Sequence, residues 1–100
     1  MAERFGLLFR ASCHQLSESV SAIIRTPRAG DRVRLRHSRG PKRIKEVFER
    51  LRVAALERQS WPLVEWKGEI VWMQGVELES DMAEDAGLKI IVEAATANPV

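Results

Sequence analysis

Residues 41–52 read PKRIKEVFERLR, and this stretch decides the fold because it predicts the main helix. Its apolar residues follow the i, i+3, i+4, i+7 spacing that gives a helix one apolar face: Ile44, Val47, Phe48 and Leu51. We expect the helix to run over about residues 42–52, with Pro41 at its first position, where the missing N–H costs nothing. Such a face needs a partner layer, and we expect Phe48 to fill the core between this helix and a sheet.

Segments on both sides of this helix have the apolar patterns of strands. The predicted strands cover residues 5–13, 20–25, 32–36, 63–66, 69–73 and 88–93. A short second helix is expected within residues 53–60, and one helical turn at residues 80–85 with Ser80 as its N-cap. Residues 94–100 are expected to fray. The pattern therefore predicts a small, single α+β domain over residues 1–100, mostly antiparallel sheet with one main amphipathic helix.

Two of these strands are predicted to form a hairpin around residues 67–68, a Lys-Gly loop with glycine where a positive φ is needed. In the register that this two-residue loop implies, the opposed pairs are Leu63 with Trp72 and Val64 with Val71. Because these apolar pairs lie on both faces, we expect at least part of the hairpin to be covered on both sides.

The composition is that of a soluble globular protein, since 45% of the 100 residues are hydrophobic and 30% are charged. The longest aliphatic runs have only a few residues, which excludes a bilayer span, and the first residues lack the apolar core of a secretory signal. A single cysteine is typical of a reducing, cytoplasmic setting. Cys13, His14 and His37 are too few for a closed zinc site, so no metal site is expected.

The formal net charge of +2 conceals an uneven distribution along the chain. Residues 1–24 are neutral, residues 25–52 carry eleven Lys and Arg against three acids, and residues 53–100 carry three against nine. The middle of the chain therefore has a net charge of +8 and the last part a net charge of −6. A basic segment of this density points to a polyanionic partner, and the acidic remainder argues against nonspecific adhesion.

Several basic residues are placed to contact phosphates. Arg32, Arg34 and Arg36 alternate with aliphatic residues, so they share the outward face of the predicted strand at a pitch of about 6.6–7 Å. This pitch can follow neighbouring phosphates of a nucleic-acid backbone. On the helix, Arg43 and Lys45 flank the apolar face. The alternatives are an edge strand whose charges prevent aggregation, and a Lys45 stem that covers the core.

Arg58 has two interpretations of equal weight. It lies three residues before Trp61 and either contacts nucleic acid or serves as a structural ion-pair or cation–π partner. The three tryptophans, Trp61, Trp66 and Trp72, could stack on unpaired bases, but core packing is favoured for side chains of a covered hairpin.

The motifs of a self-contained enzyme are missing from the sequence, which has no GxGxxG, no GxxxxGK[ST] and no HExxH. Cys13 and His14 are adjacent, so on a strand their side chains face opposite ways and are poorly placed as nucleophile and base. We therefore expect no catalytic residues and no bound cofactor in this chain.

Residues 30–75 contain four short motifs in a recognisable order. These are GDR at 30–32, KRIKEVF at 42–48, Arg58 followed by WPLV at 61–64, and EIVW at 69–72 followed by Gly75. This order resembles the C-terminal domain of tRNA(Ile)-lysidine synthetase, which shows a GDR turn, a LKxxF helix, an RxxxP element and an IxWxxG hairpin at these spacings. Residues 76–79, VELE, depart from the family, which is often basic there.

The resemblance implies a role in tRNA recognition. The family uses ATP to join lysine to the wobble cytidine of an isoleucine tRNA, in a catalytic domain whose SGGxDS-type loop is missing from this sequence. The chain would then be the non-catalytic, cytoplasmic end of such a ligase, which approaches the acceptor stem of tRNA(Ile), and a homodimer of the full-length enzyme is a further expectation. Its RNA-binding residues would be Arg32, Arg34, Arg36, Arg43, Lys45 and Arg58.

A second hypothesis comes from another class of function. The basic segment of residues 25–52 could dock an acidic protein partner rather than RNA. A tRNA-binding domain should prefer tRNA(Ile) and show a steep salt dependence, whereas a protein-interaction module should not discriminate among RNAs.

Overall fold

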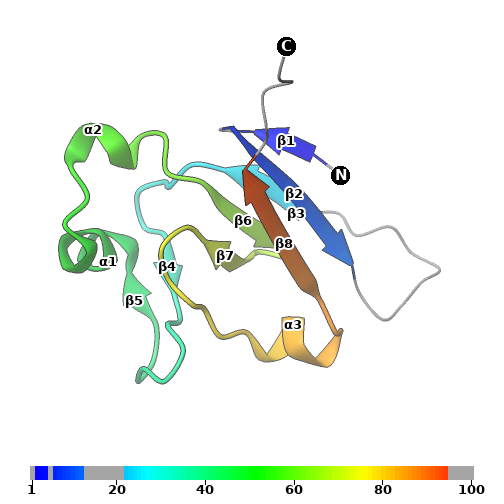
Figure 1. Ribbon diagram of the computed structural model, residues 1–100. Helices are drawn as coiled ribbons and strands as arrows, with labels where there is room; N and C mark the ends of the chain where they lie inside the picture. The colour runs from blue at the N-terminus through cyan, green and yellow to red at the C-terminus, as the bar shows by residue number, and fades with distance from the viewer. Residues whose placement is uncertain (1, 5, 13–21, 95–100) are drawn as a thin grey trace, which may run out of the picture. The chain divides into compact units, whose positions relative to one another are not determined.

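The computed structural model describes residues 2–4, 6–12 and 22–94, and it confirms the α+β class (Figure 1). The described residues form two compact units, one of residues 22–80 and the other of residues 2–4, 6–12 and 81–94. The larger unit contains the main helix, the hairpin and the whole basic segment of residues 25–52.

A three-stranded antiparallel sheet forms the base of the larger unit. Its order is β3 (Ala22–Arg25), β6 (Leu63–Trp66) and β7 (Glu69–Met73). The hairpin between β6 and β7 is confirmed, and both residues of its loop have a positive φ, 51° at Lys67 and 82° at Gly68. Positive φ at both loop positions matches the right-handed twist of the strands.

The predicted register of this hairpin is wrong beyond its first two pairs. Leu63 pairs with Met73 and Val64 with Trp72, because the register shifts between Val64 and Glu65. The shift is a β-bulge that leaves Val71 as an extra residue on β7. A bulge requires no particular residue type here, so the loop length alone could not reveal it.

The main helix is shorter at its start than predicted. It is α1 (Ile44–Leu51), and the two residues before it form β5 (Lys42–Arg43), which pairs with β4 (Arg32–Val33) in a two-stranded antiparallel ribbon. Pro41 therefore precedes a strand and does not open the helix. The first helical amide, that of Ile44, donates to the carbonyl of Asp31 at 3.1 Å, so the ribbon and the helix start are joined.

The predicted strand of residues 32–36 is also interrupted. β4 ends at Val33, Leu35 forms an isolated bridge with Leu78, and the chain turns at His37, whose φ is 63°. The alternation itself is confirmed, because Val33 and Leu35 are both buried.

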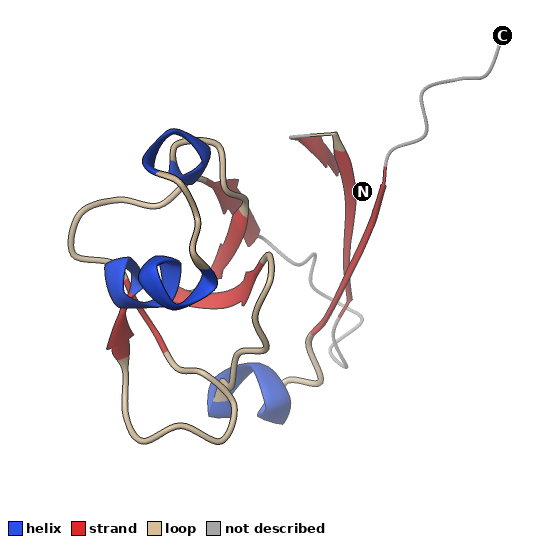
Figure 2. Cartoon of the chain, turned by 60° about the vertical axis from the view of Figure 1, so that its left-hand side comes forward, coloured by secondary structure: helices blue, strands red, loops and turns tan. Residues whose placement is uncertain are grey.

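The core of the larger unit lies between α1 and the sheet (Figure 2). It consists of residues from β4, α1, β6 and β7 and the segments that follow them: Val33, Leu35, Ile44, Val47, Phe48, Val53, Leu63, Ile70 and Met73. Phe48 is 2% exposed, as predicted, and the ring of Trp61 packs edge-on against it at 5.9 Å between centroids. The helical face predicted from the sequence is thus the buried one.

The tryptophans divide between core and margin. Trp66 is buried, whereas Trp61 and Trp72 are half-buried. The indole Nε1 of Trp61 donates to the carbonyl of Gln74 at 2.8 Å. A Cβ at Gly75 would lie 3.3 Å from the Trp61 ring, and the φ of Gly75 is +88°, so this turn needs glycine on both counts.

The short second helix is confirmed as α2 (Ala55–Arg58), within residues 53–60. Its Leu56 side chain is 81% exposed. α2 thus adds no buried side chain to the core.

The second unit is a smaller antiparallel sheet with one short helix. The strand order is β1 (Ala2–Arg4), β2 (Leu7–Ser12) and β8 (Lys89–Ala94), and the helix is α3 (Asp81–Asp85). The predicted strand at 5–13 is confirmed over Leu7–Ser12, but Gly6 lies in a turn, with a φ of 70°, between β2 and the unpredicted β1. The predicted strand at 88–93 and the helical turn at 80–85 are confirmed to within one residue at each end. The predicted fraying of residues 94–100 is wrong at its first residue, because Ala94 pairs with Leu7 in β8. Residues 95–100, like Cys13 and His14, lie outside the described residues.

Two features are absent from the described ranges of the chain. None of the helices there has the length and apolarity that a membrane span requires. In the same ranges, no three side chains of His, Cys, Asp or Glu gather closely enough to hold a metal ion.

We expect Phe48→Ala to lower the free energy of unfolding by about 3–5 kcal/mol, because it removes a ring that fills the core between helix and sheet. Leu56→Ala is the matched control: its exposed side chain should change stability by less than about 0.5 kcal/mol. Urea unfolding followed by tryptophan fluorescence measures both. A Phe48→Ala curve that overlays the wild type would show that the core is not organised around this ring.

Candidate nucleic-acid interface

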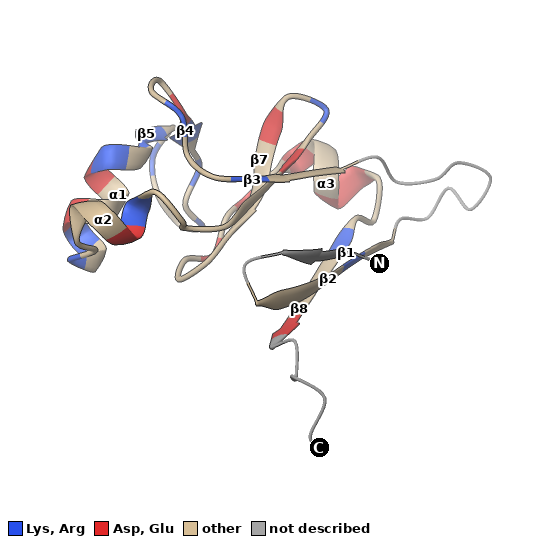
Figure 3. Cartoon of the chain, turned by 90° about the horizontal axis from the view of Figure 1, so that it is seen from above, with Lys and Arg blue, Asp and Glu red and all other residues tan. Residues whose placement is uncertain are grey.

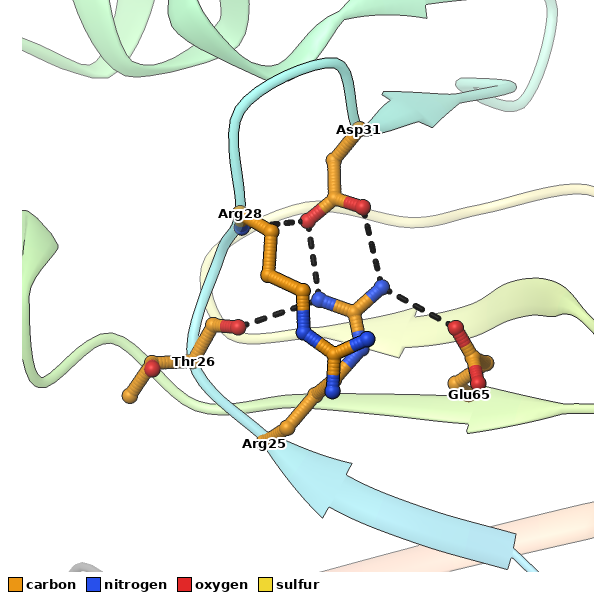
Figure 4. Close-up of polar contacts among 5 residues, drawn as sticks. All are labelled: Arg25, Thr26, Arg28, Asp31 and Glu65. Carbon is orange, nitrogen blue, oxygen red and sulfur yellow. Dashed lines mark hydrogen bonds and ion pairs between the residues drawn. The ribbon is translucent and has the colours of Figure 1, made fainter.

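A buried arginine ties three parts of the larger unit together. Arg25, at the end of β3, donates from Nη1 to Asp31 Oδ2 at 2.8 Å and from Nη2 to Asp31 Oδ1 at 2.9 Å (Figure 4). Nη2 also donates to Glu65 Oε1 on β6 at 3.1 Å, and Nη1 to the carbonyl of Thr26 at 3.0 Å. The Arg25 side chain is 9% exposed and that of Asp31 13%. We call Arg25, Asp31 and Glu65 the buried charge cluster.

The cluster fixes the turn of residues 28–31. Asp31 Oδ2 also accepts from the backbone amide of Arg28 at 2.6 Å, and the amide of Asp31 donates to the carbonyl of Arg28 at 3.1 Å. Gly30 has a φ of +87°, which glycine adopts without strain. Both oxygens of the Asp31 carboxylate are therefore engaged inside the unit.

Electrostatics keep Asp31 ionised. Burial by itself would raise the pKa of Asp31, but the hydrogen bonds from Arg25 and from the Arg28 amide, together with the nearby positive charges, outweigh it and hold the pKa below its usual value. The pKa of Arg25 is raised, mainly by its hydrogen bonds to Asp31, against the opposing effect of burial. The ion pair thus persists at neutral pH.

Beside this turn lies a hollow of about 450 Å³, which we call the basic groove. The turn of residues 28–31, the β4–β5 ribbon and the start of α1 form its walls. Its lining carries four cations, namely Arg28, Arg32, Arg43 and Lys45, together with Ala29, Gly30, Asp31 and Ile44. The four cationic residues are all exposed. Figure 3 shows how Lys and Arg gather on β4, β5 and α1.

Three of the predicted RNA-binding residues meet in this groove. Arg32 comes from β4, Arg43 from β5 and Lys45 from the first turn of α1. Their proximity depends on the pairing of β4 with β5, which the sequence reasoning did not predict.

Arg34 and Arg36 lie on the segment that runs beside residues 77–79. The amide of Arg36 donates to the carbonyl of Glu77 at 3.0 Å, and the amide of Glu79 donates to the carbonyl of Arg34 at 2.8 Å. Their side chains approach the acids of that segment, Arg34 to Glu79 at 4.0 Å and Arg36 to Glu77 at 3.9 Å. The acidic departure noted in residues 76–79 thus partly neutralises these two arginines.

Arg58 makes contacts within the larger unit. Its Nε donates to the carbonyl of Val53 at 3.1 Å, and its guanidinium lies 5.4 Å from the centroid of the Phe48 ring. These contacts agree with the interpretation of Arg58 as a structural cation–π partner. That Arg58 contacts RNA stays a prediction.

The sequence analysis did not single out Arg25 or Arg28 as functional residues. The +8 charge of residues 25–52 includes both, but neither belongs to an alternating or helical pattern. A usable signal for Arg28 is its place three residues before Asp31, a spacing at which an acidic side chain can accept from a backbone amide of the same turn.

We expect Arg25→Met to destabilise the chain by about 2–4 kcal/mol, because it leaves two largely buried carboxylates without their counter-charge. Arg36→Met is the matched control: its surface pair with Glu77 should contribute less than about 1 kcal/mol. Urea midpoints at pH 7 compare the two. Equal losses would mean that the buried charge cluster has no special role.

The lowered pKa of Asp31 sets the sign of a pH dependence. Stability from this group is present above the unfolded pKa, near 4, and is lost as the pH falls through the lower folded pKa. We therefore expect Asp31→Asn to be less stable than the wild type at pH 7, by about 1–3 kcal/mol, with the gap narrowing between about pH 4 and pH 2. Gln59→Ala, at an exposed site without an ionisable side chain, should differ from the wild type by the same amount across this pH range in urea titrations. A constant gap for Asp31→Asn would contradict the assignment.

Comparison with known proteins places this fold in a family. The family described as the TilS substrate C-terminal domain matches residues 22–93. The tRNA(Ile)-lysidine synthase of Geobacillus kaustophilus (strain HTA426) is 36% identical over 72 residues, which is 71% of this chain and 16% of that protein. The enzyme of the same name from Bacillus subtilis (strain 168) is 40% identical over 63 residues, 62% of this chain and 13% of that protein.

A solved structure shows the same fold. The crystal structure of a TILS C-terminal domain matches 97% of this chain and 78% of that chain, with a TM-score of 0.63 and 27% sequence identity. The chain spans only 13–16% of the length of the two relatives above. From the family match, the shared motifs and the common fold, this chain belongs to the family of TilS substrate C-terminal domains.

Proposed function

We propose that this chain is the tRNA-recognition domain of a tRNA(Ile)-lysidine synthase and binds the acceptor stem of tRNA(Ile). The observation that carries the proposal is the basic groove, where four exposed cations come together from the turn, the ribbon and the helix. The relatives add the identity of the RNA, since their names concern tRNA(Ile).

The chemistry of the groove suits an RNA backbone. Phosphates dominate the affinity of proteins for nucleic acids, and Arg and Lys side chains are their usual partners. An acceptor stem is an A-form helix, which proteins recognise mainly by its shape and by its phosphates and 2′-hydroxyl groups. An exposed cluster of cations on a ribbon and a helix start can contact such phosphates without any base-specific contact.

The other three predicted RNA-binding residues, Arg34, Arg36 and Arg58, have a smaller role in the proposal. Arg34 and Arg36 extend the basic surface beyond the groove, although each has an acid nearby. Arg58 would reach RNA only by leaving its contacts with Val53 and Phe48. We expect these three residues to contribute less than Arg32, Arg43 and Lys45.

The proposal also assigns the remaining steps of the reaction to other parts of the enzyme. ATP and lysine would be bound by the catalytic domain of the parent protein, in the cytoplasm, and the present domain would help to select the right tRNA. Since it would hold the acceptor stem, far from the modified cytidine, it would act through binding energy and orientation.

We expect the chain to bind an acceptor-stem minihelix of tRNA(Ile) in preference to the anticodon stem–loop of the same tRNA. With about four phosphate contacts, the plot of log K against log salt should have a slope of about −3 to −4. Fluorescence anisotropy between about 50 and 200 mM salt measures both quantities.

Three outcomes bear on the proposal. Preference for the minihelix with a steep slope supports it. Preference for the anticodon stem–loop would place the domain at the other end of the tRNA and would refute the acceptor-stem assignment. Absence of RNA binding at low salt, or equal weak binding to every RNA, would favour a module that docks an acidic protein.

A further inference from the structure

The basic groove contains two like charges in direct opposition. Arg32 on β4 and Arg43 on β5 are Cα partners in the antiparallel ribbon. Like charges directly opposite each other across two strands destabilise the pairing. Among the residues that the structure describes, neither side chain forms an ion pair. The ribbon thus carries two opposed like charges that have no ion-pair partner among the described residues.

The neighbouring side chains increase the positive charge. Arg28 and Lys45 line the same groove. The acid of the groove, Asp31, has both carboxylate oxygens bonded to Arg25, so it has little capacity left to neutralise Arg32 or Arg43. This arrangement leaves the positive charge of the groove available to an anion from outside.

The groove also has room for a ligand. A Cβ built on Gly30 would meet no atom within 4 Å, so the space beside this backbone is open. With Ala29 also in the turn, an anion can approach the groove wall without displacing a large side chain.

Two other groups of basic residues in the larger unit differ from the groove, because each has an acid beside it. Arg34 and Arg36 approach Glu79 and Glu77. A second hollow, lined by Lys42 and Arg50, measures about 70 Å³ and includes Glu46 among its lining residues.

We propose that the basic groove is a phosphate site, in which Arg32 and Arg43 together hold one phosphate group of the bound RNA while Arg28 and Lys45 lie beside it. The proposal rests on the proposed function for the identity of the ligand as tRNA. Two guanidinium groups on opposed strands can each present a pair of N–H donors to phosphate oxygens. A phosphate between the two guanidinium groups would attract both of them and so offset their mutual repulsion. The phosphate could belong to the RNA backbone or to its 5′ terminus.

The test compares two double variants that remove the same charge by the same substitution. R32Q/R43Q alters the groove, and R34Q/R36Q alters the two arginines that approach acids. We expect R32Q/R43Q to lower the affinity for a tRNA(Ile) transcript about tenfold or more and to flatten the salt slope by about 1, because one phosphate loses both of its partners. R34Q/R36Q should change the affinity by less than about threefold and the slope by less than about 0.5, because part of its charge is already compensated.

A stability readout separates loss of a phosphate site from loss of the fold. Because the substitutions remove a cross-strand repulsion, the Tm of R32Q/R43Q should equal that of the wild type or exceed it by up to a few degrees. A clearly lower Tm together with weaker binding would show that the two arginines support the ribbon and would overturn the proposal.

The terminal phosphate is distinguished by enzymatic dephosphorylation of the same tRNA. If the groove takes the 5′-terminal phosphate, its removal should weaken binding to the wild type and leave R32Q/R43Q unaffected. If the groove takes a backbone phosphate, removal should change neither. Once R32Q/R43Q has shown weaker binding, the first result assigns the site to the 5′-terminal phosphate and the second assigns it to a backbone phosphate.

The possible failures are distinguishable. If the wild-type chain binds tRNA and both double variants lose affinity and slope alike, the groove is no specific phosphate site, while the proposed function stands. If the wild-type chain binds no tRNA at low salt, the proposed function fails, and the groove assignment fails with it.

Discussion

The pairing of Arg25 with Asp31 is the interaction on which the larger unit depends. Nη1 and Nη2 of Arg25 both donate hydrogen bonds to Asp31, which fixes the end of β3 to the turn of residues 28–31. Nη2 also donates to Glu65, which fixes the same end to β6. The carbonyl of Asp31 in turn accepts from the first amide of α1. One largely buried ion pair therefore sets the sheet, the turn and the start of the main helix relative to one another, and the basic groove forms where they meet.

Within the described residues, the acidic side chains of the larger unit form ion pairs with some of its arginines and not with others. Asp31 and Glu65 neutralise Arg25, while Glu79 and Glu77 approach Arg34 and Arg36. Arg58 is held by a backbone carbonyl and an aromatic face. Of the other cations in residues 25–52, four line the groove, namely Arg28, Arg32, Arg43 and Lys45, and four lie outside its lining, namely Arg39, Lys42, Arg50 and Arg52. A net charge of +8 over residues 25–52 thus overstates the positive charge open to a ligand, and the position of the acids indicates where that charge is.

The sequence predicted those features that depend on local periodicity. The buried face of α1 followed from its i, i+3, i+4, i+7 spacing, and the hairpin loop from Lys67 and Gly68. Features decided by distant pairing were missed. Lys42 and Arg43 have good helix propensity, yet the ladder with β4 places them in a strand. The bulge at β7 and the approach of residues 77–79 to Arg34 and Arg36 likewise depend on contacts between separate segments. For this reason the groove, which brings Arg28 together with Arg43, could not be read from sequence spacing.

Whether an arginine already has an acidic partner affects how much free energy it would gain from binding RNA. Arg34 and Arg36 would have to exchange an existing acid partner for a phosphate, so the gain is reduced by what is given up. Arg32 and Arg43 give up no such partner, and their backbones are held in a ribbon whose ends are fixed by the turn and by α1. A site whose backbone is already in place loses less conformational entropy on binding. The repulsion between the two arginines in the free domain would add to this advantage, since the phosphate relieves it. The ribbon would therefore give up some stability in the free domain in return for tighter binding of the RNA.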